Sequence, residues 1–352
     1  MAIEVNIKKK FESFTLDVSF REDSKRIGIL GASGSGKSMT LRSIAGIVKP
    51  DSGMISLNGH TLYDSARHVN IKPQMRNAGY LFQNYALFPN MTVEENIAAG
   101  LRGSLAYNYP VVQRMIKKFS LQGLEKRLPG QLSGGQQQRV AIARIMAYAP
   151  DVILLDEPFS ALDIYLKDKM QVELMSMLDD YDGTVIMVSH SRDEIYRFSE
   201  RLLIIDEGKV TNHGLTKDIF ASPGTKSAAM LTGCKNFSKV EVMDSHRVNA
   251  LDWGIQLRFE KEVPAGTHYI GYRAHHFLPV WGDRPENAVR FSLYSRAELQ
   301  FETNYYVKPE KPDFSMECLI SWFVQRDVAK DIRENGMPDY LQFREDDVLF
   351  LR

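Results

Sequence analysis

A glycine-rich segment near the N-terminus has the residue types that hold phosphate groups. Its residues are Gly31, Ala32, Ser33, Gly34, Ser35, Gly36, Lys37, Ser38 and Met39. Glycines let backbone N–H groups turn inward around phosphate oxygens, and a helix N-terminus adds partial positive charge. An apolar run, residues 26–30, precedes the segment and a helix-like run follows it. This order predicts a P-loop in which Lys37 reaches the β- and γ-phosphates and Ser38 ligates Mg²⁺.

A second segment could also hold phosphate. It consists of Leu132, Ser133, Gly134, Gly135 and Gln136, and it opens a helix-like run that ends near residue 144. Free N–H groups and a hydroxyl at a helix start suit an anion, although Ser-Gly-Gly is also an ordinary cap and turn. Because a nucleotide needs only one P-loop, we expect this segment to hold the γ-phosphate of a nucleotide bound by a partner subunit.

Two acidic residues follow an apolar run and precede a proline. Residues 151–155 read as a buried strand, after which come Asp156, Glu157 and Pro158. Proline stops a strand, and a turn at the strand end lets both carboxylates reach one site. We expect Asp156 to hold Mg²⁺ through its water shell and Glu157 to polarise the attacking water.

In combination these segments resemble the ATPase subunit of an ABC transporter, from the N-terminus to about residue 230. The resemblance implies an α/β fold, a P-loop NTPase cassette with a RecA-like core and a helical subdomain. It implies ATP and Mg²⁺ as cofactors. It also implies a homodimer that closes on two ATP molecules, moves the membrane permease subunits, hydrolyses ATP and reopens.

The same resemblance assigns roles to further residues. Gln83 matches the Q-loop glutamine, which contacts Mg²⁺ and water and links the site to the membrane subunits. Asp163 matches the D-loop, which crosses the dimer interface. His190, after the apolar run 184–188, matches the switch histidine that senses the γ-phosphate. An aromatic residue that stacks on adenine should precede the P-loop: Phe11 and Phe14 both qualify, and we expect Phe11 to contact the base and Phe14 to belong to the core.

Composition fits a soluble two-domain protein and argues against a nucleic-acid surface. The 352 residues are 44% hydrophobic and 25% charged, and 44 basic residues balance 44 acidic ones. Phosphate backbones are held by excess Lys and Arg, which this chain lacks. The 2 cysteines, Cys234 and Cys318, have no metal or redox spacing, so a reduced cytoplasmic setting is expected. No run approaches the ~20 apolar residues of a transmembrane helix.

The chain should divide into two domains. Residues 1–232 read as the ATPase domain, with a parallel α/β core in 1–82 and 149–230 and a helical subdomain at about 84–148. After a linker near residues 222–226 the pattern alternates apolar and polar residues. This predicts a β-rich accessory domain over residues 236–352, with strands that include 269–273, 289–294 and 299–303 and a helix near 324–330. It resembles the small OB-like barrel of importer ATPases. His275 and His276 read as strand-end residues.

Two function classes are compatible with these motifs. One is the energy-coupling subunit of an importer, peripheral at the cytoplasmic face of the membrane and served indirectly by an extracytoplasmic binding protein. The other is a soluble ABC ATPase that acts on nucleic acid or ribosomes, but the chain has neither a repeated P-loop nor sustained heptads. Residues 189–197 and 231–236 most resemble molybdate and sulfate importer ATPases. Iron, phosphate, polyamine and sugar remain alternative substrates.

Overall fold

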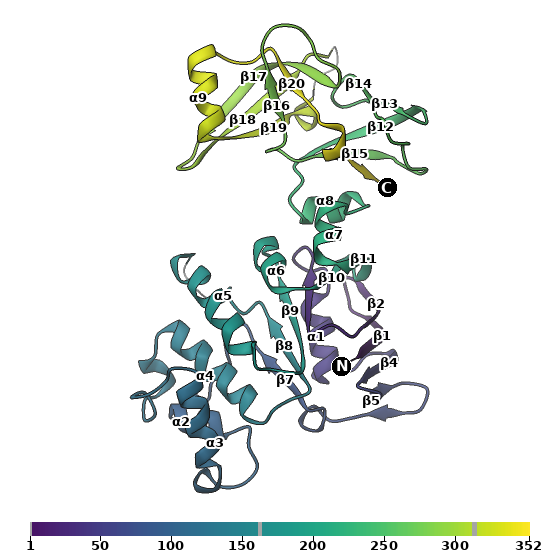
Figure 1. The fold of residues 1–352 in the computed structure, drawn as a ribbon. Helices are drawn as coiled ribbons and strands as arrows, with labels where there is room; N and C mark the ends of the chain where they lie inside the picture. Colours follow the sequence, from purple (N-terminus) through teal and green to yellow (C-terminus); the bar gives the residue numbers. More distant parts are fainter. Residues whose placement is uncertain (1, 161–163, 312–314) are drawn as a thin grey trace. The chain divides into compact units, whose positions relative to one another are not determined.

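The computed structural model describes residues 2–160, 164–311 and 315–352. The chain divides into two compact units, Met1–Lys217 and Asp218–Arg352. Each unit is organised around its own buried apolar core, and Figure 1 shows the elements of both. Within the described ranges, no helix is both long and apolar enough to cross a lipid bilayer.

The first unit is built on an 11-stranded sheet. From one edge to the other its strands are β6 (Val69–Asn70), β5 (His60–Asp64), β4 (Ser52–Leu57), β1 (Ile3–Lys10), β2 (Thr15–Glu22), β11 (Lys209–Leu215), β10 (Arg201–Asp206), β3 (Arg26–Leu30), β9 (Thr184–Ser189), β8 (Val152–Asp156) and β7 (Ala78–Leu81). Strands β10, β3, β9, β8 and β7 run parallel to one another, whereas β11 pairs antiparallel with β10. Since every residue of β8 and β9 is buried, these strands read as continuous apolar runs in the sequence.

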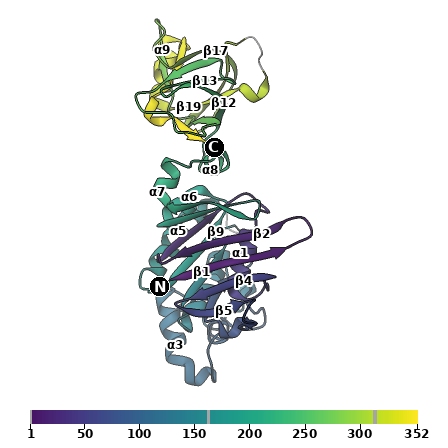
Figure 2. The ribbon, with the colours of Figure 1, turned by 90° about the vertical axis from the view of Figure 1, so that its right-hand side faces the viewer.

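The prediction of a parallel core over residues 1–82 is wrong for its N-terminal part. Strand β1 pairs antiparallel with β2 and β4, and β4 pairs antiparallel with β5; Figure 2 shows these strands side by side. Only residues 11–14 join β1 to β2. A parallel pair needs a crossover of about a dozen residues or more, so this short link allows only a hairpin.

Helices cover both faces of the parallel strands. Helix α1 (Lys37–Ala45) places Leu41 in the same apolar cluster as Ile29 of β3. Gly28, the preceding residue of β3, points the other way and lies against Ile195 of α6 (Arg192–Phe198). Because neighbouring residues of a strand face opposite sides, α1 and α6 lie on opposite faces of the sheet. Helix α5 (Ile164–Leu178) shares the α6 side.

A helical segment separates β7 from β8, as the sequence predicts. It contains α2 (Val93–Ala98), α3 (Leu105–Lys118) and α4 (Gly134–Ala147), which lie together in Figure 1. Each of these helices begins at a hydroxyl residue that accepts a backbone hydrogen bond: Thr92, Ser104 and Ser133 respectively. Such caps satisfy N–H groups that have no partner inside the helix.

The C-terminal unit confirms the prediction of a small β domain. It begins within α7 (Thr216–Ala221) and contains α8 (Lys226–Leu231), and two 5-stranded sheets pack around one core. The first sheet has β14 (Ile255–Arg258), β13 (Arg247–Ala250), β12 (Asn236–Asp244), β15 (Tyr269–Tyr272) and β21 (Leu349–Leu351). The second has β16 (Leu278–Val280), β20 (Tyr340–Gln342), β17 (Ala288–Glu298), β18 (Glu302–Pro309) and β19 (Ile320–Gln325).

Two predicted elements of this unit need correction. Residues 299–301 form the turn between β17 and β18, where Leu299 N–H donates to the Glu302 carbonyl at 2.9 Å, so a strand over 299–303 is wrong at its start. The helix expected near residues 324–330 is α9 (Arg326–Asn335), because Val324 still belongs to β19 and pairs with Thr303. In both cases apolar and polar residues alternate past the strand end, and periodicity alone does not mark a turn.

A buried arginine ties the C-terminal end of α1 to the following segment. Arg76 is 2% exposed. Its guanidinium donates to the carbonyls of Ser43 at 2.8 Å and Ile44 at 2.7 Å, and also to Ile71 and Asn70. These carbonyls are among the last of α1 and have no partner inside the helix. Burial lowers the pKa of Arg76 to about 10, which leaves the cation intact at neutral pH.

We predict that Arg76→Met destabilises the first unit by about 2–4 kcal/mol, because the apolar replacement removes the donor to the Ile44 carbonyl and leaves the Ser43 carbonyl with the Gly46 N–H. The matched control is Arg67→Met: Arg67 is 78% exposed and its ion pair with Asp64 spans 3.6 Å, so the cost should stay within ~0.5 kcal/mol. Unfolding in urea should be followed by circular dichroism, since Trp253, Trp281 and Trp322 all belong to the second unit. Equal stability of the two variants would contradict the capping role.

Candidate functional site

The glycine-rich loop joins β3 to α1 at the carboxyl edge of the parallel strands. Gly36 has φ 103°, a left-handed conformation that favours glycine. A Cβ placed there would lie 2.6 Å from Leu16 Cδ1, so a larger residue would also collide with the core. The loop therefore needs glycine at this position for its conformation and for its close packing on β2.

Lys37 is folded back over the loop that carries it. Its Nζ donates to the carbonyls of Gly31 at 2.9 Å and Ala32 at 2.8 Å, and the residue is 5% exposed. Burial lowers the pKa of Lys37, while the charges of Glu157 and Asp156 act in the opposite direction. The ammonium group is thus held at the loop by weak neutral acceptors, which an anionic ligand can replace.

An open hollow of about 340 Å³ lies over this loop. It is lined by Phe14, Ser33, Gly34, Gly36, Lys37, Ser38, Met39, Arg42 and Glu157. An adjoining hollow of about 550 Å³ shares Phe14, Ser33 and Gly34, and its lining also includes Ala32 and Ser35. Cationic and backbone N–H groups at its base and an aromatic ring at its side suit a nucleotide in chemical character.

The two aromatic candidates have different places beside this hollow. Phe14 lines both parts of it. Phe11 stacks on the Phe14 ring with centroids 4.9 Å apart, and both rings pack against the core cluster. The sequence-based expectation chose Phe11 for the base; in the structure it is Phe14 that faces the loop.

Asp156 ends β8 beside the loop and accepts two hydrogen bonds. Ser38 Oγ donates to Oδ1 at 2.7 Å, and Tyr80 Oη donates to Oδ2 at 2.6 Å. The carboxylate belongs to a residue that is 5% exposed. Ser38 and Asp156, which sequence reasoning placed in one site, are thus in direct contact.

Glu157 turns away from the strand direction immediately after Asp156. Its φ is 48°, in the left-handed region, and its N–H donates to the Val188 carbonyl of β9 at 3.0 Å. Its side chain lines the hollow over the loop, and its Oε2 lies 3.4 Å from His190 Nδ1. The backbone twist is what lets adjacent carboxylates reach the same site, where strand alternation would separate them.

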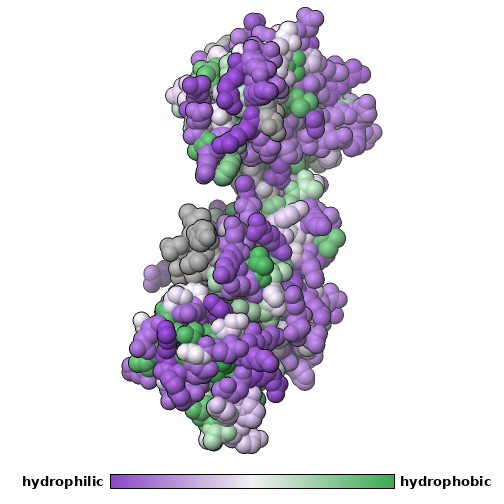
Figure 3. Space-filling view, turned by 60° about the vertical axis from the view of Figure 1, so that its left-hand side comes forward, coloured by the Kyte–Doolittle hydropathy of each residue, from purple (hydrophilic) through white to green (hydrophobic). Residues whose placement is uncertain are grey.

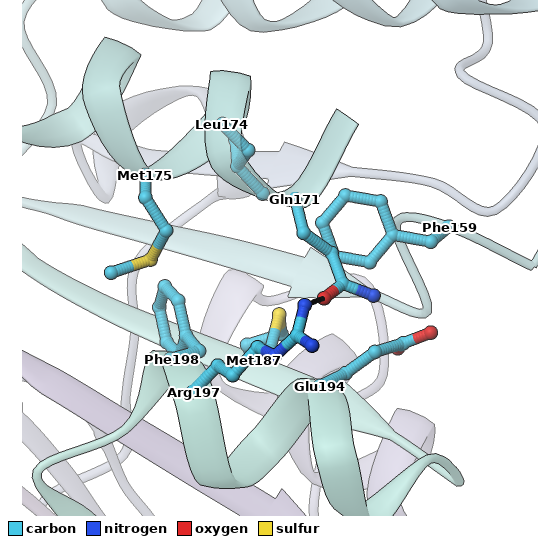
Figure 4. Close-up of a pocket in the computed structure, with 8 residues that line it drawn as sticks. All are labelled: Phe159, Gln171, Leu174, Met175, Met187, Glu194, Arg197 and Phe198. Carbon is cyan, nitrogen blue, oxygen red and sulfur yellow. Dashed lines mark hydrogen bonds between the residues drawn. The ribbon is translucent and has the colours of Figure 1, made fainter. Parts of the chain in front are cut away.

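The loop that carries His190 is hydrogen-bonded to α6 through the residue before it, Ser189. Ser189 Oγ donates to the Glu194 carboxylate at 2.5 Å, and Glu194 is 6% exposed. Behind this loop α5, α6 and β9 enclose a cavity of only about 10 Å³. Figure 4 shows the side chains around it, with Arg197 hydrogen-bonded to Gln171. The cavity is too small for a ligand and is a packing gap beneath the histidine loop.

The second glycine-rich segment begins helix α4. Ser133 Oγ accepts from the Gln136 N–H, and the Gln136 side chain accepts from the Ser133 N–H at 2.9 Å, which completes a capping box. Leu132 and Gly135 are buried, the latter against Met170 of α5, whereas Ser133 and Gly134 are exposed. None of residues 132–136 is among the described residues that line the hollow over the P-loop.

The remaining sequence-derived candidates are placed as follows. Gln83 is exposed and lies two residues after the end of β7. Asp163 lies outside the described residues. His275 and His276 follow β15 and contact different carboxylates, Glu302 at 2.9 Å and Asp347 at 3.2 Å. Over the described part of the chain there is no group of three or more His, Cys, Asp or Glu side chains placed to hold a metal ion.

Sequence reasoning did not identify the contact of Tyr80 with Asp156, and it favoured Phe11 over Phe14 as the aromatic residue beside the loop. Tyr80 lies in the apolar run before Gln83, where a phenol reads as a core residue; only its position one strand away from Asp156 reveals the contact. The alternating pattern of this segment predicts that Phe14 belongs to the core. In the structure Phe14 lies in the turn at residues 11–14, and its ring lines the hollow over the P-loop.

Comparison with known proteins identifies relatives of the chain. The family model described as ABC transporter matches residues 15–160. The chain is 39% identical over 226 residues to a sulfate/thiosulfate import ATP-binding protein of Synechocystis, covering 62% of each chain. It is 35% identical over 239 residues to a molybdenum import ATP-binding protein of Mannheimia succiniciproducens, covering 65% of this chain and 67% of that one. Relatives named for iron(III) and polyamine import match over similar spans.

A solved structure supports the same fold. It is a dimeric ATP-binding cassette in a post-hydrolysis state bound to ADP and Pi, 29% identical to this chain, with a TM-score of 0.51. The match covers 61% of this chain and 99% of the other. The chain therefore contains an ATP-binding cassette fold. The match spans less than two thirds of the length of the sulfate/thiosulfate relative.

Proposed function

The chain belongs to the ABC transporter family, and we propose that it is the ATP-hydrolysing subunit that drives an importer. The observation that carries this proposal is the convergence of Lys37, Ser38 and Glu157 on one open hollow. A cation and N–H groups for the phosphates and a carboxylate for the attacking water are the parts that phosphoryl transfer to water needs.

Glu157 and His190 have complementary roles in this proposal. The Glu157 carboxylate orients water and accepts its proton, and the imidazole beside it fixes the carboxylate and contacts the γ-phosphate. Their 3.4 Å separation supports a paired action. The left-handed turn at Glu157 directs its carboxylate into the hollow without moving Asp156 away from Ser38.

The residues near the P-loop fit a magnesium ion. Ser38 Oγ and Asp156 Oδ1 lie 2.7 Å apart, so both oxygens can reach one cation directly or through water. Mg²⁺ prefers oxygen ligands and binds through few protein groups plus phosphates and water. We assign Ser38 and Asp156 to it, with Gln83 as a further ligand; bound there, Mg²⁺ would neutralise charge on the phosphates.

We further propose that two copies of the chain form the complete sites. In each site the P-loop of one copy holds ATP, and residues 132–136 of the other copy hold the γ-phosphate. The exposed Ser133 and Gly134 at the start of α4 support this, since they lie outside the hollow of their own chain and the first N–H groups of α4 have no carbonyl partner inside the helix. A relative of the same fold is a dimer.

The membrane partner is proposed to dock on the helical segment. Several large apolar or aromatic side chains are exposed there: Phe88, Met91, Tyr107, Tyr109 and Leu128. Figure 3 shows hydrophobic side chains among polar ones on this lower part of the first unit. Arg144 of α4 donates to the carbonyls of Tyr85 and Ala86, both of which have positive φ, and so fixes the segment that follows Gln83.

For the transported substrate we propose molybdate or tungstate, or else sulfate. The names of two relatives that match at 35% and 39% identity support oxyanions. Iron, phosphate, polyamine and sugar are the alternatives, since permeases and an extracytoplasmic binding protein choose the substrate. In this proposal the chain works at the cytoplasmic face of the membrane, held there by the permease subunits.

Glu157→Gln is expected to bind MgATP and to lose at least ~100-fold in hydrolysis, because a carboxamide keeps the shape but accepts no proton. The matched control is Glu207→Gln: Glu207 lines the adjoining hollow and has φ 45°, close to the 48° of Glu157. Phosphate release and ATP binding should be measured on both. Turnover of Glu157→Gln within a few-fold of the parent would remove Glu157 from this role.

Ser133→Arg should abolish ATP-driven dimerisation while ATP binding to the single chain stays within about twofold, because the large side chain fills the proposed γ-phosphate seat. Ser104→Arg is the control, since Ser104 caps α3 in the same way and is also exposed. Light scattering with and without MgATP measures the molar mass and so distinguishes single chains from dimers. An unchanged ATP-dependent dimer of Ser133→Arg contradicts the two-copy site.

Phe14→Ala should weaken ATP binding by roughly tenfold, the size of one lost base–aromatic stack. Phe11→Ala should have the smaller effect, since Phe11 supports Phe14 by stacking and does not line the hollow. Calorimetry with ATP, and with triphosphate lacking a base, separates stacking from phosphate binding. A larger loss for Phe11→Ala would assign the base to Phe11 instead.

A further inference from the structure

Asp156 is held from two sides by elements far apart in the sequence. Ser38 of α1 contacts one carboxylate oxygen at 2.7 Å, and Tyr80 of β7 contacts the other at 2.6 Å. Asp156 itself is almost completely buried. Without Tyr80, the second oxygen would lose its donor, and the carboxylate could rotate about its last bond.

Tyr80 is itself fixed by its surroundings. Strand β7 pairs parallel with β8, with Tyr80 opposite Leu154. The phenol ring packs against Phe82 with centroids 4.5 Å apart, and Arg42 of α1 also interacts with the phenol. Burial and, next, the hydrogen bond to Asp156 raise the pKa of Tyr80 above its ordinary range.

We propose that Tyr80 is a positioning residue for the cation site: its hydrogen bond fixes the Asp156 carboxylate so that the other oxygen stays directed at Ser38. This inference rests on the proposed function, since it assumes that Ser38 and Asp156 serve Mg²⁺. It concerns the orientation of a ligand and not the chemical step. A carboxylate whose orientation is already fixed is pre-organised for a cation, whereas a carboxylate that can rotate loses affinity because it must be ordered on binding.

The position of Tyr80 also connects two parts of the site. Gln83 follows it by three residues along the same segment and lies two residues beyond the end of β7. Tyr80 therefore lies on the stretch of chain that connects the proposed cation site with Gln83 and, beyond it, with the helical segment.

The test uses the full chain with Tyr80→Phe, which removes only the hydroxyl. Tyr148→Phe is the matched control, because the Tyr148 hydroxyl contacts the same strand at the Ala78 carbonyl, at 3.4 Å, and not Asp156. Two quantities are measured: the affinity for a non-hydrolysable ATP analogue in EDTA, by calorimetry, and the affinity of the protein–analogue complex for Mn²⁺, by the electron paramagnetic resonance signal of free Mn²⁺.

We expect Tyr80→Phe to keep the analogue affinity in EDTA within about twofold and to weaken Mn²⁺ binding by roughly tenfold, the size of one lost hydrogen bond to a charged group. The Mg²⁺ concentration for half-maximal hydrolysis should rise by a similar factor, and Tyr148→Phe should change neither.

Unchanged Mn²⁺ affinity in Tyr80→Phe, with normal metal binding by the parent chain, overturns the inference alone. A parent complex that binds Mn²⁺ no more tightly than the free analogue overturns the proposed cation site as well. Loss of analogue binding in EDTA would make Tyr80 a structural residue and also contradict the proposal.

Discussion

The parallel pairing of β3, β9, β8 and β7 is the constraint on which the site depends. Because these strands point the same way, the segments that follow them emerge at one edge of the sheet. The P-loop follows β3, His190 follows β9, Asp156 ends β8, and Gln83 lies just beyond β7. The P-loop and His190 are more than 150 positions apart in the sequence, and the hydrogen bonds between these parallel strands bring them to one region.

Local interactions then refine what the sheet brings together. The N–H of Glu157 donates to Val188 across the β8–β9 pair, and this bond accompanies the left-handed turn that directs the Glu157 side chain to the hollow. Ser189 is fastened to Glu194 of the next helix. A left-handed non-glycine residue costs of order 1 kcal/mol, which the surrounding strands must offset. The candidate site therefore carries backbone strain at Glu157, where the neighbouring strands support it.

Sequence reasoning succeeded where chemistry requires a fixed spacing. The glycine loop with Lys37, and the strand that ends in Asp156, were identified because local residue order is itself the signal. It failed where partners are distant or turns are involved. Tyr80 reads as core until β7 is known to lie beside β8, and Phe14 reads as a strand residue until the turn over residues 11–14 is known. The antiparallel N-terminal strands were missed because alternation does not reveal strand direction.

The central claim is that one copy supplies the P-loop and another copy supplies Ser133 to the same nucleotide. Photolabelling tests it most directly: tagged Lys37→Ala chains, whose own P-loop is disabled, are mixed with the parent chain and an ATP analogue that carries a photoreactive group on its γ-phosphate. The account predicts label on the peptide that contains Ser133 in the tagged, P-loop-disabled chain. Label confined to the chain with the intact P-loop would contradict it.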